Sequence, residues 1–535
     1  MKHLSTLFLW LLPLASWAQA VVAVPPPDAP RQTARTELLL DPQTDDVQVQ
    51  AMPSDTAVVL LVSRQAKMIG APEYHFQHYR AGLALYREQK VEIADEYQVE
   101  RLCAEPGVVY AVFSSRHVPG KLLVAAYNVR GGQVHTQEFV TKQSRELVAV
   151  RAVDGRLLAT VTLADQLHQT VLLMDVATGG FQFLPSLYES LSSELTSVTD
   201  APAGRAEFVL SQTNGRRQRL MLKQLSSEHG QLLRSEMVQT ESERTLITAQ
   251  LSPLQDTSAR LLAGTYGLRS PQYAQGLFAT DLTAPPANPA NPRPALRFYD
   301  FRRMRHFFDY LKPAKEARLR DRSARREARA ASPMRWHFHV LLHELLPQAD
   351  GGYTLVAEVY YPNYRYNSYN GMSPGFANVP MMRSGSYGYL PYSVYNTPGR
   401  AFMGFRTTHV LVCGFDRRGN LLWDNTYVLG NDLLHSELEE AVRTLTLPDG
   451  RIALAYLDTD NELHYKLIKQ GEAAPNDYKV DLLTAANGVK EKVLETRQPE
   501  VQPLAGRQYV ATGFQRIRSD KGPERQVFFL QTLEF

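Results

Sequence analysis

The feature that most constrains the fold is a hairpin-like unit that recurs along the chain. Its clearest copy is the stretch 408–427, THVLVCGFDRRGNLLWDNTY, in which two apolar runs flank an Asp and a Gly-containing turn. This pattern predicts a β-hairpin. Comparable stretches occupy 122–139, 170–184, 219–233 and 462–472. Their turn glycines recur at intervals of about 50 residues where the copies are adjacent; they are Gly132, Gly180, Gly230, Gly419 and Gly471.

A period of about 50 residues is typical of propeller blades. A four-stranded blade cannot bury both of its faces alone, so blades stack in a ring. Further units are indicated at 276–282, where Asp281 aligns with Asp175 and Asp416, in the 56–93 region and at the end of the chain. The Ser-rich segment 186–200 is expected to be a connection. We predict an all-β fold, a β-propeller of seven or eight blades; unrelated β-meanders in a sandwich are the alternative.

The first 20 residues have the pattern of a secretory signal peptide. Lys2 precedes an apolar stretch from Leu7 to Leu14, and Ala18 and Ala20 form a small-residue end. The stretch is too short for a transmembrane helix, and no other run reaches the length of a span, so no transmembrane anchor is expected. We therefore expect export to the periplasm or the cell exterior. Residues 21–55 are expected to be an N-terminal leader and 56–535 the propeller-like domain.

Residues 312–331, KPAKEARLRDRSARREARAA, differ from the rest in composition. Basic residues far outnumber acids, and Ala, Arg, Leu and Glu favour helix. We predict a short basic helix with little apolar surface to bury. It is either a solvated connection between blades or a docking site for an acidic partner or an anionic surface. Nucleic acid is not expected as a partner, because the chain is expected to be exported.

Residues 362–404 form an insertion rich in Tyr, Asn, Gly, Ser and Pro. A loop of this length in a compact domain either has a function or is disordered. Tyr and Asn with Gly make adaptable binding surfaces. The insertion contains no Asp or Glu and cannot supply a carboxylate pair. The candidate binding residues, which would stack on a sugar or hold a peptide, are Tyr364, Arg365, Tyr366, Tyr369, Tyr387, Tyr389 and, in the strand that leads to the insertion, Glu358.

The sequence shows no catalytic signature: no G-x-S-x-G elbow, no Walker loop and no HExxH helix. Histidines near 73–78 and 337–343 lack the spacing that completes a metal shell, so we predict no metal site and no cofactor. Cys103 and Cys413 lie in apolar strand contexts and are expected to be unpaired core residues.

Two segments, LLMDVATGGFQF and GFDRRGNLLWDN, resemble quinoprotein-type propeller repeats, in which Asp, Gly and a following Trp recur. The matching residues are Asp175, Gly179, Asp416, Gly419 and Trp423; Phe183 stands near the first Trp position. This resemblance implies that Trp423 packs between sheets, and it carries no quinone-binding residue. More widely, 240–430 resembles a group of uncharacterised secreted β-propeller-like proteins of Bacteroidetes, through GTYG, DGGY, VAEVYY and VLVCGFDRRGNLLW. That resemblance implies fold and compartment and leaves the activity open.

These observations favour an exported, non-catalytic binding or scaffold protein, whose ligand is a glycan, a peptide or an envelope protein. The alternative is a secreted hydrolase that acts on polysaccharide or peptide through carboxylates converging at the propeller mouth. The fold alone does not choose between them, because propellers host both functions.

Overall fold

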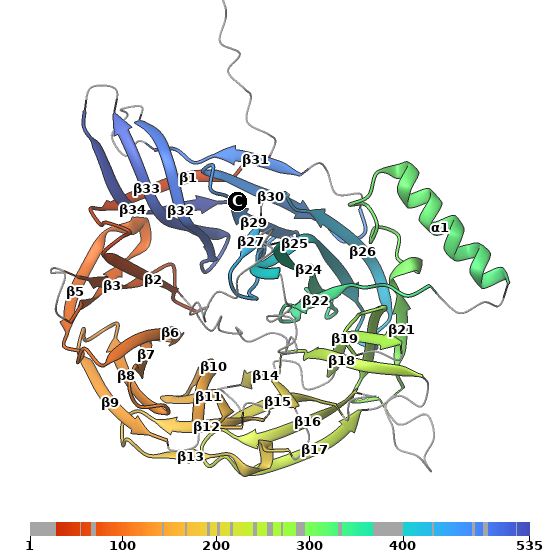
Figure 1. Ribbon diagram of the computed structural model, residues 1–535, viewed down its shortest axis with the longest axis horizontal. Coiled ribbons are helices and arrows are strands. Elements are labelled where there is room, and N and C mark those ends of the chain that lie inside the picture. Colours follow the sequence, from red (N-terminus) through yellow and green to blue (C-terminus); the bar gives the residue numbers. More distant parts are fainter. Residues whose placement is uncertain are drawn as a thin grey trace, which may run out of the picture.

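The computed structural model describes residues 28–535 except for 54, 66–70, 142–143, 166–167, 190–192, 201–203, 214–217, 239–242, 254–259, 269–270, 285–294, 330–333, 367–399, 431–432, 473–476, 485–490 and 520–521. The described chain forms eight antiparallel sheets arranged in a ring, which are the blades of a propeller (Figure 1). Among these residues no helix is both long and apolar enough to cross a membrane.

Seven blades have four strands and the sixth has six. Blade 1 contains β2 (Asp45–Ala51), β3 (Val58–Arg64), β4 (Glu73–Tyr79) and β5 (Leu85–Val91), and blade 2 contains β6 (Tyr97–Glu105), β7 (Val108–Ser115), β8 (Lys121–Asn128) and β9 (Val134–Val140). Blade 3 contains β10 (Ser144–Val153), β11 (Arg156–Leu163), β12 (Gln169–Asp175) and β13 (Phe181–Phe183). Blade 4 contains β14 (Ser193–Asp200), β15 (Arg205–Thr213), β16 (Gln218–Ser226) and β17 (Leu232–Val238). Blades 5 and 6 contain β18 (Arg244–Leu251), β19 (Leu261–Leu268), β20 (Gly276–Asp281), β21 (Arg297–Asp300); and β22 (His339–Leu342), β23 (Leu346–Pro347), β24 (Tyr353–Tyr366), β25 (Arg400–Phe415), β26 (Leu421–Val428), β27 (Leu434–His435). Blades 7 and 8 contain β28 (Arg443–Thr446), β29 (Ile452–Leu457), β30 (Glu462–Ile468), β31 (Tyr478–Asp481); and β32 (Glu491–Pro503), β33 (Gln508–Ser519), β34 (Glu524–Glu534), β1 (Arg31–Leu38).

The helical elements are short except for one. Three 3-10 turns, η1 (Ala81–Leu83), η2 (Pro185–Leu187) and η3 (Phe301–Arg303), lie in connections, and α1 (Pro313–Ala328) projects from the rim beside blades 5 and 6 (Figure 1). The first strand of each blade lies toward the centre of the ring and the last at its rim, as β6 and β9 show in blade 2. Residues on β6, β10, β22, β28 and β32 are therefore placed to face the central space.

The core consists of apolar layers between neighbouring blades. Each of the eight junctions has its own buried cluster, from the one that joins blades 1 and 2, with Phe76 and Tyr127 stacked at 5.1 Å, round to the one that joins blades 8 and 1. Middle strands such as β3 and β29 are almost continuously apolar, because both of their faces are covered. Burial at about 25 cal/mol per Å² in every junction is the main stabilising contribution.

The recurring Asp-Gly unit is the turn between the third and fourth strands of a blade. Asp175 and Asp416 accept hydrogen bonds from backbone N–H groups two to four residues ahead, which fixes the turn. Gly419 has φ of +77°, and a Cβ on it would lie 3.2 Å from Ala279 in the preceding blade. Small residues at this turn thus allow neighbouring blades to approach closely. In blade 3 the left-handed glycine is Gly179, next to the Gly180 expected from the spacing.

The ring is closed by the beginning of the chain, which pairs with its end. Strand β1 is antiparallel to β34, from Arg31 opposite Glu534 to Leu38 opposite Phe528. Arg35 donates to Gln515 and Gln531 of blade 8 and to the carbonyl of Leu483 beyond blade 7. Thr36 donates to the carbonyl of Leu83, which lies between β4 and β5 of blade 1. This single strand therefore joins the first, seventh and eighth blades.

The all-β propeller expected from the sequence is confirmed, with eight blades, and the basic helix predicted at 312–331 is observed as α1. Two boundaries need correction. Part of the expected leader, 21–55, is built into the ring as β1 and β2, and the expected connection at 186–200 contains β14, the innermost strand of blade 4. Both were missed because β1, β2 and β14 are rich in polar residues and lack the apolar runs by which the other strands were found. Residues 1–20, with the expected signal peptide, lie outside the described residues.

Removal of the closing strand is expected to destabilise the whole ring. A chain that begins at Asp41 loses β1, and each ladder hydrogen bond contributes about 0.5–1.5 kcal/mol net. We therefore expect a loss of more than about 2 kcal/mol in the free energy of unfolding, measured in urea, against a control chain that begins at Asp28. Equal unfolding midpoints for the two chains would show that β1 does not hold the ring closed.

Candidate functional site

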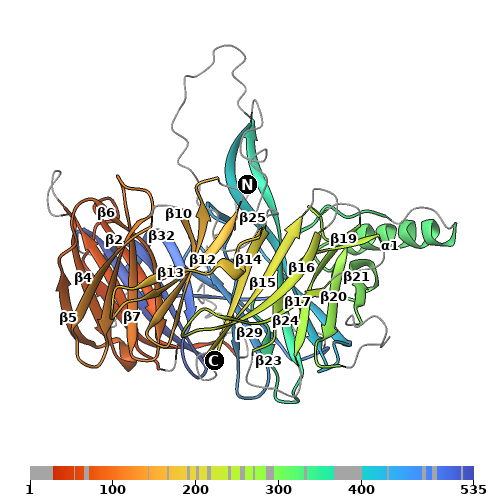
Figure 2. The ribbon, with the colours of Figure 1, turned by 90° about the horizontal axis from the view of Figure 1, so that it is seen from below.

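Blade 6 carries the most prominent departure from the repeat. Its strands β24 and β25 are twice the length of most others and run on together as a twisted hairpin that stands above one face of the ring (Figure 2). We call this face the mouth. The pairing continues to Tyr366 opposite Arg400, so the described ends of the 362–404 segment are strands. The intervening residues 367–399 lie outside the described part of the chain.

Two irregularities twist the hairpin. The register of β24 on β25 shifts once between Val359 and Tyr360 and again between Asn363 and Tyr364. Such bulges bend and twist a pair of strands. Gly404 lies at the second shift with φ of +129°, and a Cβ there would lie 2.3 Å from the carbonyl oxygen of His435. Glycine therefore allows β27 to pair closely with the hairpin.

A continuous row of rings runs from the top of blade 5 along this hairpin. Tyr360 links its two halves: its ring centroid is 5.4 Å from His339 and 5.8 Å from Phe405. The row continues from Phe405 to Phe402 at 5.1 Å and from Phe402 to Tyr364 at 5.7 Å. We call it the aromatic ladder; its members are Tyr273, His337, His339, Tyr360, Phe405, Phe402 and Tyr364. The middle rings are buried, whereas His337 is exposed and Phe402 and Tyr364 are partly exposed.

One histidine of the aromatic ladder, His339, is uncharged near neutral pH. Burial, reinforced by the neighbouring His337, lowers the pKa of His339 to about 4. His339 is therefore uncharged near neutral pH, and its ring serves in packing against Tyr360 and Tyr273. The rings of this row are suited to stacking on the apolar face of a ligand.

Charged side chains gather where blade 6 passes into blade 7. Arg443, the first residue of β28, lies 3.2 Å from Glu440 and 3.5 Å from Glu500 of β32, and the charge of Glu439 also acts on it. We call these four residues the Arg443 cluster. Leu438, directly before it, packs on Tyr360 and Phe405. The aromatic ladder and the Arg443 cluster are thus two parts of one surface.

Contacts across the ring show that this surface faces the central space. Glu344, which follows β22, forms an ion pair with Arg151 of β10, although blades 3 and 6 are not neighbours. Arg101 of β6, in blade 2, acts electrostatically on Glu439. Solvent nevertheless reaches the carboxylates, because the side chains of Glu439 and Glu500 are 57% and 40% exposed.

The Arg443 cluster is held in place by a buried acid–base pair. Glu358 of β24 is fully buried and accepts hydrogen bonds from the backbone N–H groups of Ala441 at 3.1 Å and Val442 at 2.9 Å. Its carboxylate also lies 2.9 Å from Nε2 of His343. Burial by itself would lower the pKa of His343, but Glu440 and Glu358 outweigh it and raise that pKa above its usual value. The pair therefore fixes the start of β28 and with it Arg443.

The pKa values of Glu500 and Glu439, the two most exposed carboxylates of the Arg443 cluster, are shifted in opposite directions. Although the Glu500 side chain is 40% exposed, the surrounding protein removes part of its hydration and raises its pKa, an effect that Arg443 only partly offsets. The pKa of Glu439 is lowered by its hydrogen bond with His435 and further by Arg443 and Arg101. Pairs of carboxyl groups whose surroundings shift their pKa values apart can divide the roles of acid and base.

The structure separates the residues that the sequence nominated for binding. Tyr364 joins the aromatic ladder, and Arg365 is exposed on β24; Tyr366 ends that strand. Tyr369, Tyr387 and Tyr389 lie outside the described residues. The nomination of Glu358 as a ligand-contacting group needs correction. Its carboxylate is inaccessible and is occupied by blade-to-blade hydrogen bonds, so that it positions other residues.

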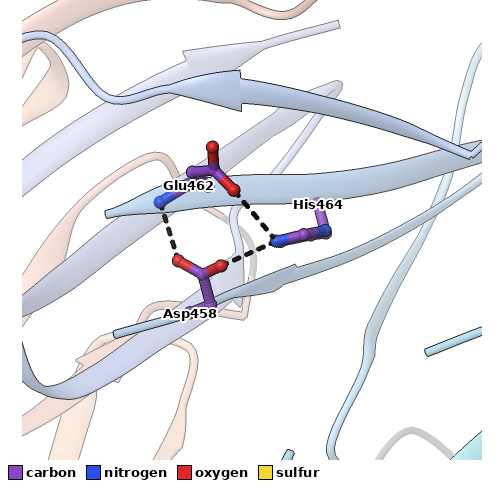
Figure 3. Close-up of side chains that lie close together, drawn as sticks. All are labelled: Asp458, Glu462 and His464. Atoms are coloured by element: carbon purple, nitrogen blue, oxygen red, sulfur yellow. Dashed lines mark hydrogen bonds and ion pairs between the residues drawn. The ribbon is translucent and has the colours of Figure 1, made fainter. Parts of the chain in front are cut away.

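One group of side chains in the described part of the chain has the chemistry of a metal site. Asp458, Glu462 and His464 of blade 7 meet at the turn between β29 and β30 (Figure 3). All three already have partners. Asp458 accepts from backbone N–H groups and from Nε2 of His464 at 2.7 Å, and Glu462 pairs with Lys479 at 2.8 Å. The network is complete without a cation and fixes a tight turn.

The Arg443 cluster and most of the aromatic ladder could not be found from the sequence. Arg101, Arg443 and Glu500 come from three blades and lie in ordinary strand contexts. The only local signal is the adjacent pair Glu439 and Glu440 directly before a strand. The two cysteines are unpaired, as expected, with Cys413 fully buried. Trp423 packs at the junction of blades 6 and 7, which confirms its expected place between sheets.

No protein-family model matches the chain, and no curated protein matches it. Solved structures with a similar arrangement include a europium-containing methanol dehydrogenase, at 7% identity and a TM-score of 0.44, which covers 95% of this chain and 93% of that chain. The WD40 domain of SCAP from fission yeast has 8% identity and a TM-score of 0.41, with 95% and 98% covered. A polysaccharide lyase has 10% identity and a TM-score of 0.36, with 94% and 99% covered. At these values the activities of those proteins carry no argument for this chain.

Substitution of the buried carboxylate is expected to change both stability and its pH dependence. Since the pKa of His343 is higher in the folded chain than its usual 6.5, protonated His343 stabilises the fold below about pH 6.5, and this contribution is lost as the pH rises through the folded value. Glu358→Gln removes the partner charge, so we expect a cost of about 3 kcal/mol and a flatter loss of stability above pH 6.5.

Urea unfolding between pH 6 and 9 measures both effects. Glu344→Gln is the matched control, because the Glu344 side chain is 52% exposed and lies in the same region of the ring. An unchanged pH slope in Glu358→Gln would show that the His343 pair does not fix this part of the fold.

Proposed function

We propose that this chain is an exported binding protein that holds its ligand at the propeller mouth, between the aromatic ladder and the Arg443 cluster. The observation that carries the proposal is the continuity of these two surfaces through Leu438. The signal-peptide pattern of residues 1–20 is the support for export.

The chemistry of the mouth suits a glycan or a peptide. Phe402 and Tyr364 offer ring faces that stack on sugar rings or on apolar side chains. Arg443 and the carboxylates around it offer donors and acceptors for hydroxyl or amide groups. Ligand pockets commonly combine a rigid aromatic wall with a few polar groups of this kind.

The hairpin explains how the nominated tyrosines would contribute. β24 and β25 raise residues 364–366 above the ring (Figure 2), and the segment that carries Tyr369, Tyr387 and Tyr389 begins and ends on this support. In this proposal Tyr364, Arg365 and Tyr366 contact the ligand, whereas Glu358 acts indirectly by holding Ala441 and Val442.

Loss of the outer rings of the aromatic ladder is expected to weaken capture. We predict that the double variant Tyr364→Ala with Phe402→Ala lowers affinity for the bound glycan or peptide at least about tenfold, because stacked rings are frequent binding hot spots. The ligand is first identified by a thermal-shift screen of glycans and peptides with the chain from Val21 onward, and affinity is then measured by calorimetry.

The matched control for this variant is Phe181→Ala, which removes an exposed ring from β13 at the rim of blade 3. If the double variant and the control bind the ligand as tightly as the parent chain, the ligand is not held by the aromatic ladder.

A second function, hydrolysis of a polysaccharide or a peptide at the same mouth, is favoured by the opposite pKa shifts of Glu500 and Glu439. In that case Glu500 would be the proton donor and Glu439 the ionised base or nucleophile. Both carboxylates are reached by solvent and both lie beside Arg443.

Hydrolysis predicts a specific kinetic outcome. Activity should be bell-shaped in pH, and both Glu500→Gln and Glu439→Gln should lower kcat/KM at least about 100-fold while binding is retained. Glu495→Gln, on the same strand β32 but paired with Arg497, is the control. Turnover that survives both substitutions would exclude this pair of carboxylates, and capture without turnover across the panel leaves binding as the function.

A further inference from the structure

The helix α1 is attached to the ring by one of its faces. Arg320 donates to the backbone carbonyls of Arg302, Met304 and Arg305 at 2.9–3.2 Å. Ser323 is buried against Arg302, and Leu319 packs on the apolar cluster between blades 5 and 6. The helix is therefore a fixed part of the molecule and stands out from the rim (Figure 1).

The acidic residues of α1 all have basic partners. Glu316 pairs with Arg320 at 2.6 Å, Asp321 pairs with Arg325 at 2.6 Å, and Glu327 pairs with Arg302 and Arg303 of the body. The remaining bases of the helix have no ion pair among the described residues. Its positive charge is thus concentrated in these remaining bases.

These bases form a straight row. At about 100° per residue, their positions fall within an arc of about 80°, which borders the attached face without including it. All are exposed. We call them the cationic stripe; its members are Lys315, Arg318, Arg322, Arg326 and Arg329. The stripe is about 21 Å long, with about one cation per helical turn.

The stripe is unfavourable for the isolated helix. Arg318, Arg322 and Arg326 follow one another at intervals of four residues, and like charges at this spacing destabilise a helix. The third face of α1 carries alanines, with the ion pair of Asp321 and Arg325 as its charged residues, so no large apolar side chain is available to enter a bilayer. A row of cations with no apolar flank matches a linear polyanion better than a lipid surface.

We propose that the cationic stripe of α1 binds a linear acidic polysaccharide, whose carboxylate or sulfate groups follow the row of arginines. This site is separate from the propeller mouth; the inference rests on the proposed export but not on the ligand proposed for the mouth. Export, proposed above, makes nucleic acid unavailable as the partner. Attachment through α1 would hold the ring against an anionic matrix with the mouth unobstructed.

The test uses the chain from Val21 onward with five probes. Alginate carries carboxylates and heparin carries sulfates, while dextran is neutral; phosphatidylglycerol vesicles and duplex DNA represent the other anionic surfaces. We expect binding to alginate or heparin and not to dextran, with an affinity that falls as salt is raised.

The decisive variant is Arg318→Gln with Arg322→Gln and Arg326→Gln. It should weaken polysaccharide binding at least about tenfold and reduce the dependence of log Kd on log salt. Its thermal midpoint should stay at or above that of the parent, because these side chains are exposed and repel one another. The control, Arg31→Gln with Arg130→Gln and Lys492→Gln, removes the same charge from exposed positions elsewhere and should bind as the parent does.

Equal losses in the two triple variants would overturn the proposal, since net charge alone would then explain the binding. Tighter binding to vesicles or DNA than to either polysaccharide would also overturn it. The mouth variant Tyr364→Ala with Phe402→Ala should keep its polysaccharide affinity, so that failure at the mouth and failure at the cationic stripe are distinguished.

Discussion

Every blade of this chain has two apolar faces, and neither face is covered by anything within the blade. The eight buried clusters lie between blades, so each sheet buries both of its apolar faces only when the ring is closed. This makes closure the condition on which the rest depends. The chain meets it by pairing β1 with β34, which covers an edge that would otherwise be free. The small turn residues, of which Gly419 is an example, let the blades approach closely enough for these clusters to form.

The candidate site lies where one blade departs from the repeat. In blade 6, β24 and β25 continue beyond the sheet as a hairpin, and the segment that leads to β28 folds beneath it. Each element there is supported by another. Gly404 admits β27, Leu438 packs on the aromatic ladder, and Glu358 holds the backbone from which Arg443 extends. A rigid ring thus presents an irregular surface, which is the usual arrangement of scaffold and functional loop.

Electrostatics divide the molecule into two regions. Inside the ring, charges of both signs lie together, as in the ion pair of Arg151 with Glu344 and in the Arg443 cluster. On α1 every acidic residue forms an ion pair, either within the helix or with an arginine of the ring, which leaves a row of basic residues on the outside. The net charge of +3 conceals this separation, because composition averages over regions that do not interact. Only the outer region resembles a surface for polyanions.

The sequence by itself determined the repeat, the all-β fold and the basic helix, because these follow from local patterns of apolar runs, Asp-Gly turns and helix-forming residues. It also showed that segment 362–404 interrupts a blade. Only the tertiary structure decided that β1 closes the ring, that Glu358 is buried beneath His343, and that Arg101, Glu439 and Glu500 face one space. These groups come from blades far apart in the chain, and their meeting depends on the number of blades and on closure, which no local pattern encodes.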